Sequence, residues 1–251
     1  MEKEKRKRLH LLDEIRGFLI LGVVVSHTLF DLHNIFEMDL PWTQSWYVKA
    51  ISDIGALLFI LISSMVSKYS KDNISRGMKL LAVATALTLV TNLIMPTMVI
   101  YAGILHHLAF AIILMELLRP LLKKIPAIPA LIFLLLLALF TWNIYEREIG
   151  LLGFTFYEIP ANVLDGGLSY LLGLKIINII QSSDYYPVLP WMPFFFMGFY
   201  LIDYIEKPKI KTFFEKKRFG FLGKVGKISL WIYLLHQPLI YGILTLITSF
   251  K

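Results

Sequence analysis

The sequence predicts an all-α integral membrane protein: a polytopic bundle of about seven transmembrane helices whose amino terminus lies in the cytoplasm. Of its 251 residues, 57% are hydrophobic and only 17% are charged, whereas soluble domains are about 45–50% apolar and about 25% charged. The apolar residues form blocks of about 20, the length needed to cross a hydrocarbon core of roughly 30 Å. This pattern excludes a disordered, collagen-like or coiled-coil chain and a single water-soluble globule.

Seven segments have the length and apolar character of spanning helices. They are predicted at 14–36, 47–67, 77–96, 99–119, 126–145, 188–205 and 226–249. The first follows a basic segment, as a signal peptide would, but it lacks a small-x-small cleavage site and continues into His27 and Asp31. We therefore expect a retained helix within a single transmembrane domain, 1–251.

Positive charges set the predicted orientation. Of the 25 Lys and Arg residues, 21 lie in the amino-terminal segment or follow the second, fourth and sixth segments. The positive-inside rule then predicts a multi-pass protein of the cell membrane with a cytoplasmic amino terminus and an external carboxyl terminus. The net charge of +7 would suggest nucleic acid in a soluble protein, but cytoplasmic loops account for it here.

Two connections are long, and the cysteine count restricts the chemistry. The external loop 146–187 is predicted to contain a re-entrant or interfacial helix around 163–180, and 206–227 forms a basic cytoplasmic loop. Loops of this length in compact domains tend to be functional.

The absence of cysteine excludes disulfides and thiolate catalysis. No internal repeat supports a transporter of the inverted-repeat kind.

A polar stripe follows the first span. At 100° per residue, five polar side chains fall within about 60° of one another: Asp13, Arg16, His27, Asp31 and Asn34. Ionisable groups inside a span indicate function, and His27 and Asp31 are one turn apart, so the carboxylate can orient the imidazole. Arg16 lies roughly 16 Å along the axis from His27, at the cytoplasmic mouth. Alternatively, Arg16 extends to the membrane surface and His27 only hydrogen-bonds a neighbouring helix.

Two later spans also carry polar groups. His106 and His107 point about 100° apart, so at most one faces the interior, and we expect this to be His106. The spacing of a helical metal site is missing, so no metal is predicted. In the last span, one face carries a set of four residues that bind substrate or hold helices together: Ser229, Tyr233, His236 and Gln237.

The start of the sixth span is rich in aromatic residues. The sequence Asp184-Tyr-Tyr-Pro187-Val-Leu-Pro190-Trp191 fits an outer aromatic belt, with Asp184 as a helix cap. Near the cytoplasmic face, Glu116 and Asp203 are expected to pair with nearby Arg119 or Lys207.

These motifs together resemble a known family. Leu12-Asp-Glu-Ile-Arg16-Gly17, His27 to Asp31, Gly103 to His106, Asp184 to Trp191 and Ser229 to Pro238 resemble, in this order, the heparan-alpha-glucosaminide N-acetyltransferase catalytic domain family, especially its small prokaryotic members. The first and last motifs are also similar to the acyltransferase-3 group. The resemblance implies an enzyme that moves an acetyl group from cytoplasmic acetyl-CoA, a co-substrate, to an amine or hydroxyl of an extracytoplasmic sugar or glycan, with no permanently bound cofactor.

The sequence departs from the family at two places. Ser64 stands where the family often has glycine. The lysosomal enzyme's catalytic histidine lies in its first luminal loop, and His33 is the nearest loop histidine in this chain.

The residues and the resemblance together give a predicted site. His27 and Asp31 are expected to be catalytic, and Asp13, Arg16 and His106 to bind acyl-CoA. The acceptor is assigned to a third set: Asn34, Asp184, Trp191, Tyr233, His236 and Gln237. Two other functions stay open, a proton-coupled transporter of a small solute and a non-catalytic membrane assembly partner. The expected partners are the bilayer, the two substrates and, through the apolar fifth segment, a second copy of the chain, but no nucleic acid.

Overall fold

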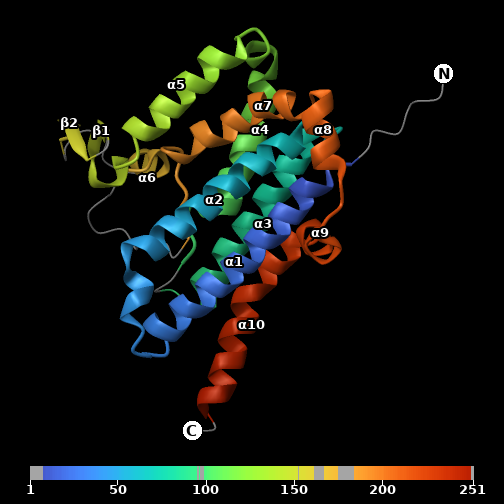
Figure 1. Cartoon of the computed structure of the whole chain (residues 1–251). Helices are drawn as coiled ribbons and strands as arrows, with labels where there is room; N and C mark the ends of the chain where they lie inside the picture. Colours follow the sequence, from blue (N-terminus) through green and yellow to red (C-terminus); the bar gives the residue numbers. More distant parts are fainter. Residues whose placement is uncertain are drawn as a thin grey trace. The chain divides into compact units, whose positions relative to one another are not determined.

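The computed structural model describes residues 8–94, 96, 99–151, 153–160, 167–174 and 184–249. The described residues form ten α-helices and one β-hairpin (Figure 1). The chain divides into two compact units, the first made of residues 1–62 and 204–251 and the second of residues 63–203. The expected single transmembrane domain stays a prediction.

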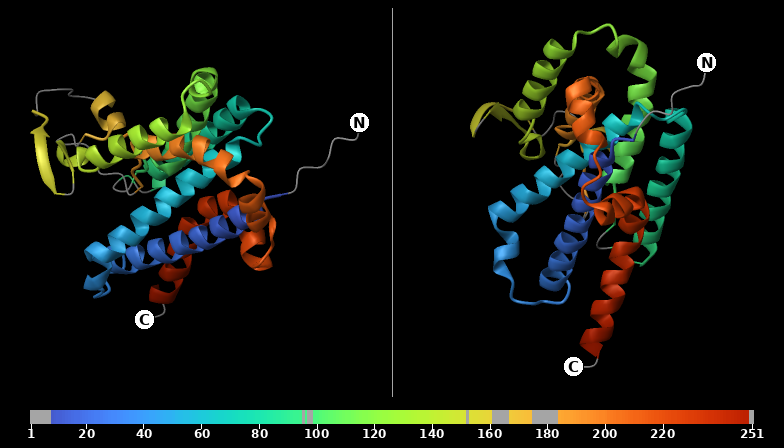
Figure 2. Two further views of the ribbon diagram at one scale, coloured as in Figure 1. Left: turned by 45° about the horizontal axis from the view of Figure 1, so that its top comes forward. Right: turned by 45° about the vertical axis from the view of Figure 1, so that its right-hand side comes forward.

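The first unit brings the two ends of the chain together. Its elements are α1 (His10–Asn34), the 3₁₀ helix η1 (Pro41–Gln44), most of α2 (Trp46–Ser67), α8 (Pro208–Glu215), α9 (Gly220–Lys227) and α10 (Ser229–Ser249). Helix α1 packs against α9 and α10, and both views of Figure 2 show α9 beside the amino-terminal end of α1. Residues more than 200 positions apart in the sequence are therefore neighbours.

Glycine allows α1 and α9 to touch backbone to backbone. A Cβ added to Gly17 would lie 2.0 Å from the carbonyl oxygen of Leu222, and one added to Gly226 would lie 1.8 Å from that of Asp13. Both separations are far below van der Waals contact, so only residues without a side chain fit at these two positions. Glycine recurs at every third position of α9, from Gly220 to Gly226.

The second unit contains the remaining elements. They are α3 (Asn73–Ile94), α4 (Ile104–Leu122), α5 (Ala127–Phe140), the 3₁₀ helix η2 (Ile144–Glu146), β1 (Glu148–Leu151), β2 (Phe154–Glu158), α6 (Gly167–Leu172) and most of α7 (Trp191–Ile205). Helix α3 packs against α4, and β1 pairs antiparallel with β2. Fully buried apolar side chains of α4 and α7, among them Ile112, Met115 and Phe195, form its core.

Five helices of the described residues are long and apolar enough to cross a membrane: α1, α2, α3, α4 and α10. Helices α5 and α7 are also apolar but have only 14 and 15 residues, about 21–23 Å of helix. A hydrocarbon core is roughly 30 Å thick. The predicted helical membrane bundle is confirmed, whereas the count of seven spans and the orientation stay predictions.

The long loop 146–187 differs from its prediction. It begins with the β-hairpin, which was not predicted although the alternating run Phe154 to Tyr157 favours a strand. The predicted helix around 163–180 is described only where α6 lies, because 163–166 and 175–180 are outside the described residues.

The ion pairs predicted for Glu116 and Asp203 differ in their outcome. Arg119 Nη2 lies 2.7 Å from Glu116 Oε2, which is the pairing expected for Glu116. Asp203 instead pairs with Lys68. The ammonium of Lys207 lies 4.5 Å from the centre of the Tyr204 ring, and this contact with an aromatic face gives it another partner.

Candidate active site

A buried carboxylate–amide pair joins α1 to α10. The Asp31 side chain is fully buried, and Gln237 Nε2 donates to both of its oxygens, at 2.9 and 3.1 Å. An ionised carboxylate only accepts hydrogen bonds, so the amide nitrogen must face it. Gln237 Oε1 then points elsewhere, and this atom is buried without a hydrogen-bond partner in the described part of the chain. Gln237, predicted to bind the acceptor, thus also holds Asp31.

Two histidines also meet across the same pair of helices. The rings of His27 and His236 contact edge to face, with centroids 4.9 Å apart and planes at 77°. His236 Nδ1 lies 2.5 Å from the carbonyl oxygen of Tyr233, which only accepts, so Nδ1 carries the proton. In the neutral ring, Nε2 of His236 is therefore unprotonated and basic. The Tyr233 ring centre lies 5.4 Å from that of His236.

His27 and Asp31, two residues of the polar stripe of α1, contact side chains of α10 rather than each other. Within the described residues no hydrogen bond joins His27 to Asp31. His27 contacts His236, and Asp31 binds Gln237. The structure therefore brings together four of the predicted site residues through contacts between helices.

The two ends of the stripe differ. Near the amino-terminal end of α1, Arg16 Nη2 donates to Ser229 Oγ at 2.8 Å, and its guanidinium carbon lies 6.0 Å from the centre of the Phe59 ring. At the other end Asn34 is exposed, and its amide donates to the carbonyl of Phe30 in its own helix. Arg16 thus connects α1 to the first turn of α10, whereas the hydrogen bond of Asn34 stays within α1.

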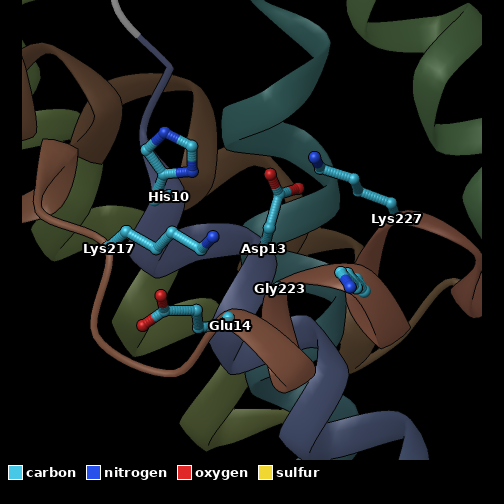
Figure 3. Close-up of a pocket in the computed structure, with 8 residues that line it drawn as sticks. His10, Asp13, Glu14, Lys217, Gly223 and Lys227 are labelled. Carbon is cyan, nitrogen blue, oxygen red and sulfur yellow. The ribbon is translucent and has the colours of Figure 1, made fainter.

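A cavity of about 120 Å³ lies between α1 and α9 (Figure 3). It is lined by His10, Asp13, Glu14, Lys217, Gly220, Gly223, Lys224 and Lys227. Figure 3 shows Lys217 and Lys227 extending from opposite sides toward the turn of α1 that carries Asp13. Four of the eight lining residues are lysine or histidine, and two others are the acids Asp13 and Glu14, so charges of both signs surround the cavity.

Glu14 holds the segment that leads into α9. Its Oε1 accepts from the backbone N–H groups of Arg218 and Phe219, at 2.8 and 3.1 Å. Because a carboxylate satisfies otherwise unpaired donors at a helix start, it stabilises the entry to α9. Glu14 Oε2 is buried without a hydrogen-bond partner among the described atoms.

In the second unit, Asp184 binds a helix start distant in sequence. Its Oδ2 accepts from the N–H of Ile104, the first residue of α4, at 3.0 Å. A Cβ on Gly103 would lie 2.5 Å from this oxygen, so glycine makes room for the carboxylate. The Tyr186 N–H also donates to the carbonyl of Ala102, at 2.9 Å. Asp184 was expected to cap the sixth span and to bind the acetyl acceptor. In the structure it caps α4.

Both histidines of α4 have partners within the second unit. Buried His107 uses Nδ1 to bind the carbonyl of Pro187 at 3.2 Å. His106 Nε2 lies 3.3 Å from Thr88 Oγ1, which donates to the carbonyl of Ile100 at 2.6 Å. His107 therefore links the segment before α7 to α4. Because the Thr88 hydroxyl uses its only proton toward Ile100, it accepts a hydrogen bond from His106.

Aromatic rings surround the same segment. The Tyr185 ring lies 4.6 Å from that of Tyr170, and its hydroxyl donates to the Tyr170 carbonyl at 2.5 Å. Burial, together with the neighbouring hydroxyls of Tyr170 and Tyr145, raises the pKa of Tyr185 above its ordinary value. Trp191 is buried, with its ring 4.9 Å from Tyr186. Trp191, predicted to bind the acceptor, packs inside this aromatic cluster.

No role was predicted for Glu14, Gly17 or Gly226. Two signals were present in the sequence. One was a second acid directly after Asp13, and the other was glycine at every third position of 220–226. Neither signal shows which helix is the neighbour, and so neither identified the contact.

The fold and this arrangement define a class: a polytopic helical membrane protein in which two histidines and a carboxylate meet between two candidate spanning helices. Within the described residues no group of three or more His, Asp or Glu could hold a metal ion. The family model described as "Heparan-alpha-glucosaminide N-acetyltransferase, catalytic" matches residues 8–238, and the chain belongs to this family of membrane acetyltransferases. No curated protein and no solved structure matched the chain.

Proposed function

We propose that the protein moves an acetyl group from cytoplasmic acetyl-CoA to an amine or hydroxyl of a sugar or glycan outside the cell membrane. Membership of the acetyltransferase family supports the reaction class. The observation that carries the proposal is the pairing of His27 with His236 and of Asp31 with Gln237 between α1 and α10. This pairing places two imidazoles and a buried carboxylate together inside candidate spans.

The length of α1 supports a donor that enters from the cytoplasmic end. Arg16 and the basic loop after α7 supply charge-assisted donors for the phosphates of acetyl-CoA. From Arg16 to His27 the helix rises roughly 16 Å, close to the reach of an extended pantetheine arm, on the order of 15–20 Å. The thioester would then lie near His27.

His27 is assigned as the general base. It removes a proton from the attacking amine or hydroxyl as this group adds to the thioester carbonyl. The tetrahedral adduct then breaks its carbon–sulfur bond, and the departing CoA thiolate takes the proton. The buried charge of Asp31 stabilises the imidazolium formed in between. A variant of this route, in which His27 carries the acetyl group briefly, uses the same residues.

The acceptor is assigned to groups on α1 and α10. Gln237 Oε1 is buried and has no hydrogen-bond partner among the described residues, so it can accept a hydrogen bond from the amine or hydroxyl of the substrate. His236 Nε2 can accept a second hydrogen bond. Asn34 and Tyr233 complete this set. The roles assigned to Asp13 and His106 toward the donor, and to Asp184 and Trp191 toward the acceptor, stay predictions.

Acetyl transfer in inverted vesicles tests the proposal. Vesicles loaded with glucosamine receive labelled acetyl-CoA from outside, and labelled N-acetylglucosamine is measured within. His27→Ala should lower the rate by about 100-fold or more, the usual contribution of a general base. Val25→Ala, at an exposed position of α1, should keep full activity.

A second variant separates the two candidate histidines. If His33→Ala abolishes transfer while His27→Ala retains it, the catalytic base is the loop histidine and the assignment of His27 is wrong. Labelled product from the wild-type protein only when acetyl-CoA is outside the vesicles would support the cytoplasmic donor side.

A further inference from the structure

Strand β2 presents aromatic rings at the surface of the second unit. All five of its residues are exposed, and the side chains of Phe154, Phe156 and Tyr157 are 73%, 65% and 57% exposed. Large apolar side chains that are exposed as a group, rather than singly, indicate an interaction surface. A hairpin of two strands is also only marginally stable in water by itself. The hairpin β1–β2 is therefore expected to have a partner for its aromatic side chains.

The hairpin is attached to the carboxyl-terminal end of α5 (Figure 1). Phe140, the last residue of α5, contacts Phe156, with the ring centroids 5.8 Å apart. At the base of the hairpin, Arg147 Nε donates to the carbonyl of Ile159 at 3.1 Å. The Ile159 N–H donates in turn to the carbonyl of Arg147, at 2.8 Å. The rings of β2 are thus held where the apolar surface of α5 ends.

Helix α5 indicates which partner covers the hairpin. All 14 of its residues are apolar, and Ile128, Ile132 and Phe133 are among its exposed side chains. A helix that is apolar on every side and exposed in a membrane protein contacts lipid. At about 21 Å, however, α5 is shorter than a hydrocarbon core of roughly 30 Å. Aromatic rings at its end add apolar surface that the helix itself lacks.

Both ends of α5 carry residue types that mark membrane–water interfaces. Exposed Lys123 and Lys124 lie just before α5, and lysines near the end of a span extend to the headgroups. Trp142 follows the other end, and aromatic residues concentrate at the headgroup level. The edges of a hairpin leave backbone groups unpaired, which the hydrocarbon core does not tolerate. The hairpin therefore fits the interface and not the core.

We propose that the hairpin β1–β2 is an interfacial anchor, in which the rings of Phe154, Phe156 and Tyr157 lie between the phospholipid headgroups and the upper acyl chains. The anchor extends the short apolar length of α5 and fixes the depth of this helix in the bilayer. Glu158, the charged last residue of β2, stays in contact with water. Because the anchor contacts lipid and not a substrate, it does not depend on the proposed function.

Fluorescence quenching tests the position of the anchor. The chain has no cysteine, so Phe154→Cys labelled with the aromatic fluorophore bimane reports on that position alone. In nanodiscs that hold one copy of the full chain, nitroxide lipids should quench this bimane and aqueous iodide should not. Glu158→Cys is the matched control on the same strand, and iodide should quench its bimane. Quenching at position 154 by iodide and not by nitroxide lipid would overturn the proposal.

A pair of double variants tests what the anchor does. Phe154→Ser/Phe156→Ser shortens the apolar surface at the end of α5, so a thick bilayer should destabilise this variant more than a thin one. Its melting temperature should fall by about 2–4 °C more in the thick bilayer. Phe154→Trp/Phe156→Trp keeps interfacial rings and should match the wild type in both. An equal fall in both bilayers for the serine variant would overturn the anchor, because the rings would then only pack on the protein.

Other occupants of this surface give different readouts. If position 154 is quenched by iodide until a glucosamine oligosaccharide is added, the rings bind a glycan and the anchor is overturned. If nitroxide lipids no longer quench position 154 when two copies share a nanodisc, the rings face a second copy of the chain, which also overturns it. None of these measurements uses acetyl transfer, so the anchor and the proposed function fail separately.

Discussion

The two units use the same residue types in different ways. In the first unit, His27 and Asp31 contact side chains of α10. In the second, Asp184 and His107 bind backbone groups of segments 80 residues away. A side chain that binds backbone groups, as Asp184 and His107 do, holds segments together, whereas His27 faces a second titratable side chain, His236, with which it can exchange protons. The proposed chemistry therefore lies in the first unit, whereas in the second unit Asp184 and His107 attach the segment before α7 to α4.

The largest expected effect concerns the backbone contact in the first unit. Gly226→Val should destabilise the protein by about 3 kcal/mol or abolish folding, because its side chain would overlap the carbonyl of Asp13. Thermal unfolding in detergent measures this change. Gly242→Ala is the matched control, since nothing lies within 4 Å of its added Cβ, and it should stabilise α10 by roughly 0.5–1 kcal/mol. Equal stability of Gly226→Val and wild type would contradict the close contact.

The next effect concerns the carboxylate–amide pair. Gln237→Leu removes the donor to buried Asp31 and should lower the free energy of unfolding by about 2 kcal/mol. Adding Asp31→Asn should recover part of this loss, because the buried charge is gone. A double-mutant cycle by chemical denaturation gives the coupling, expected at about 1–3 kcal/mol. Additive effects would show that the two side chains act independently.

The smallest effect tests the second unit. Asp184→Ala removes the cap of α4 and should cost about 1 kcal/mol of stability, whereas Asp184→Asn, which keeps an acceptor oxygen, should cost less. Melting temperature and the KM for glucosamine are measured together. A raised KM with unchanged stability would instead assign Asp184 to acceptor binding and remove the contrast between the units.

Much of the fold could be predicted from hydropathy. The long apolar segments became α1, α2, α3, α4 and α10, since each contains enough apolar residues to define it alone. The boundaries were less accurate: the fourth span begins at Ile104 rather than at 99, because Gly103 and Asp184 set the helix start. The hairpin was missed because strand patterns of four or five residues are weak beside spans of 20.

The sequence predicts which helices carry the residues of the candidate site, but not which side chains these residues contact. Periodicity placed His27, Asp31, His236 and Gln237 on polar faces of two helices, and these faces meet. It suggested a bond between His27 and Asp31, because spacing along one helix reports only neighbours within that helix. Glu14 depends on a contact about 200 residues away, which no local pattern contains.

The glycine contact between α1 and α9 has a consequence for the distances along α1. Gly17 and Gly226 set the separation of the two helices by backbone contact, so α9 cannot shift without moving the first turns of α1. Glu14 and His27 lie on the same continuous helix, about 20 Å apart along its axis. The cavity beside Glu14 and the imidazole of His27 are therefore held at a fixed separation by one rigid helix.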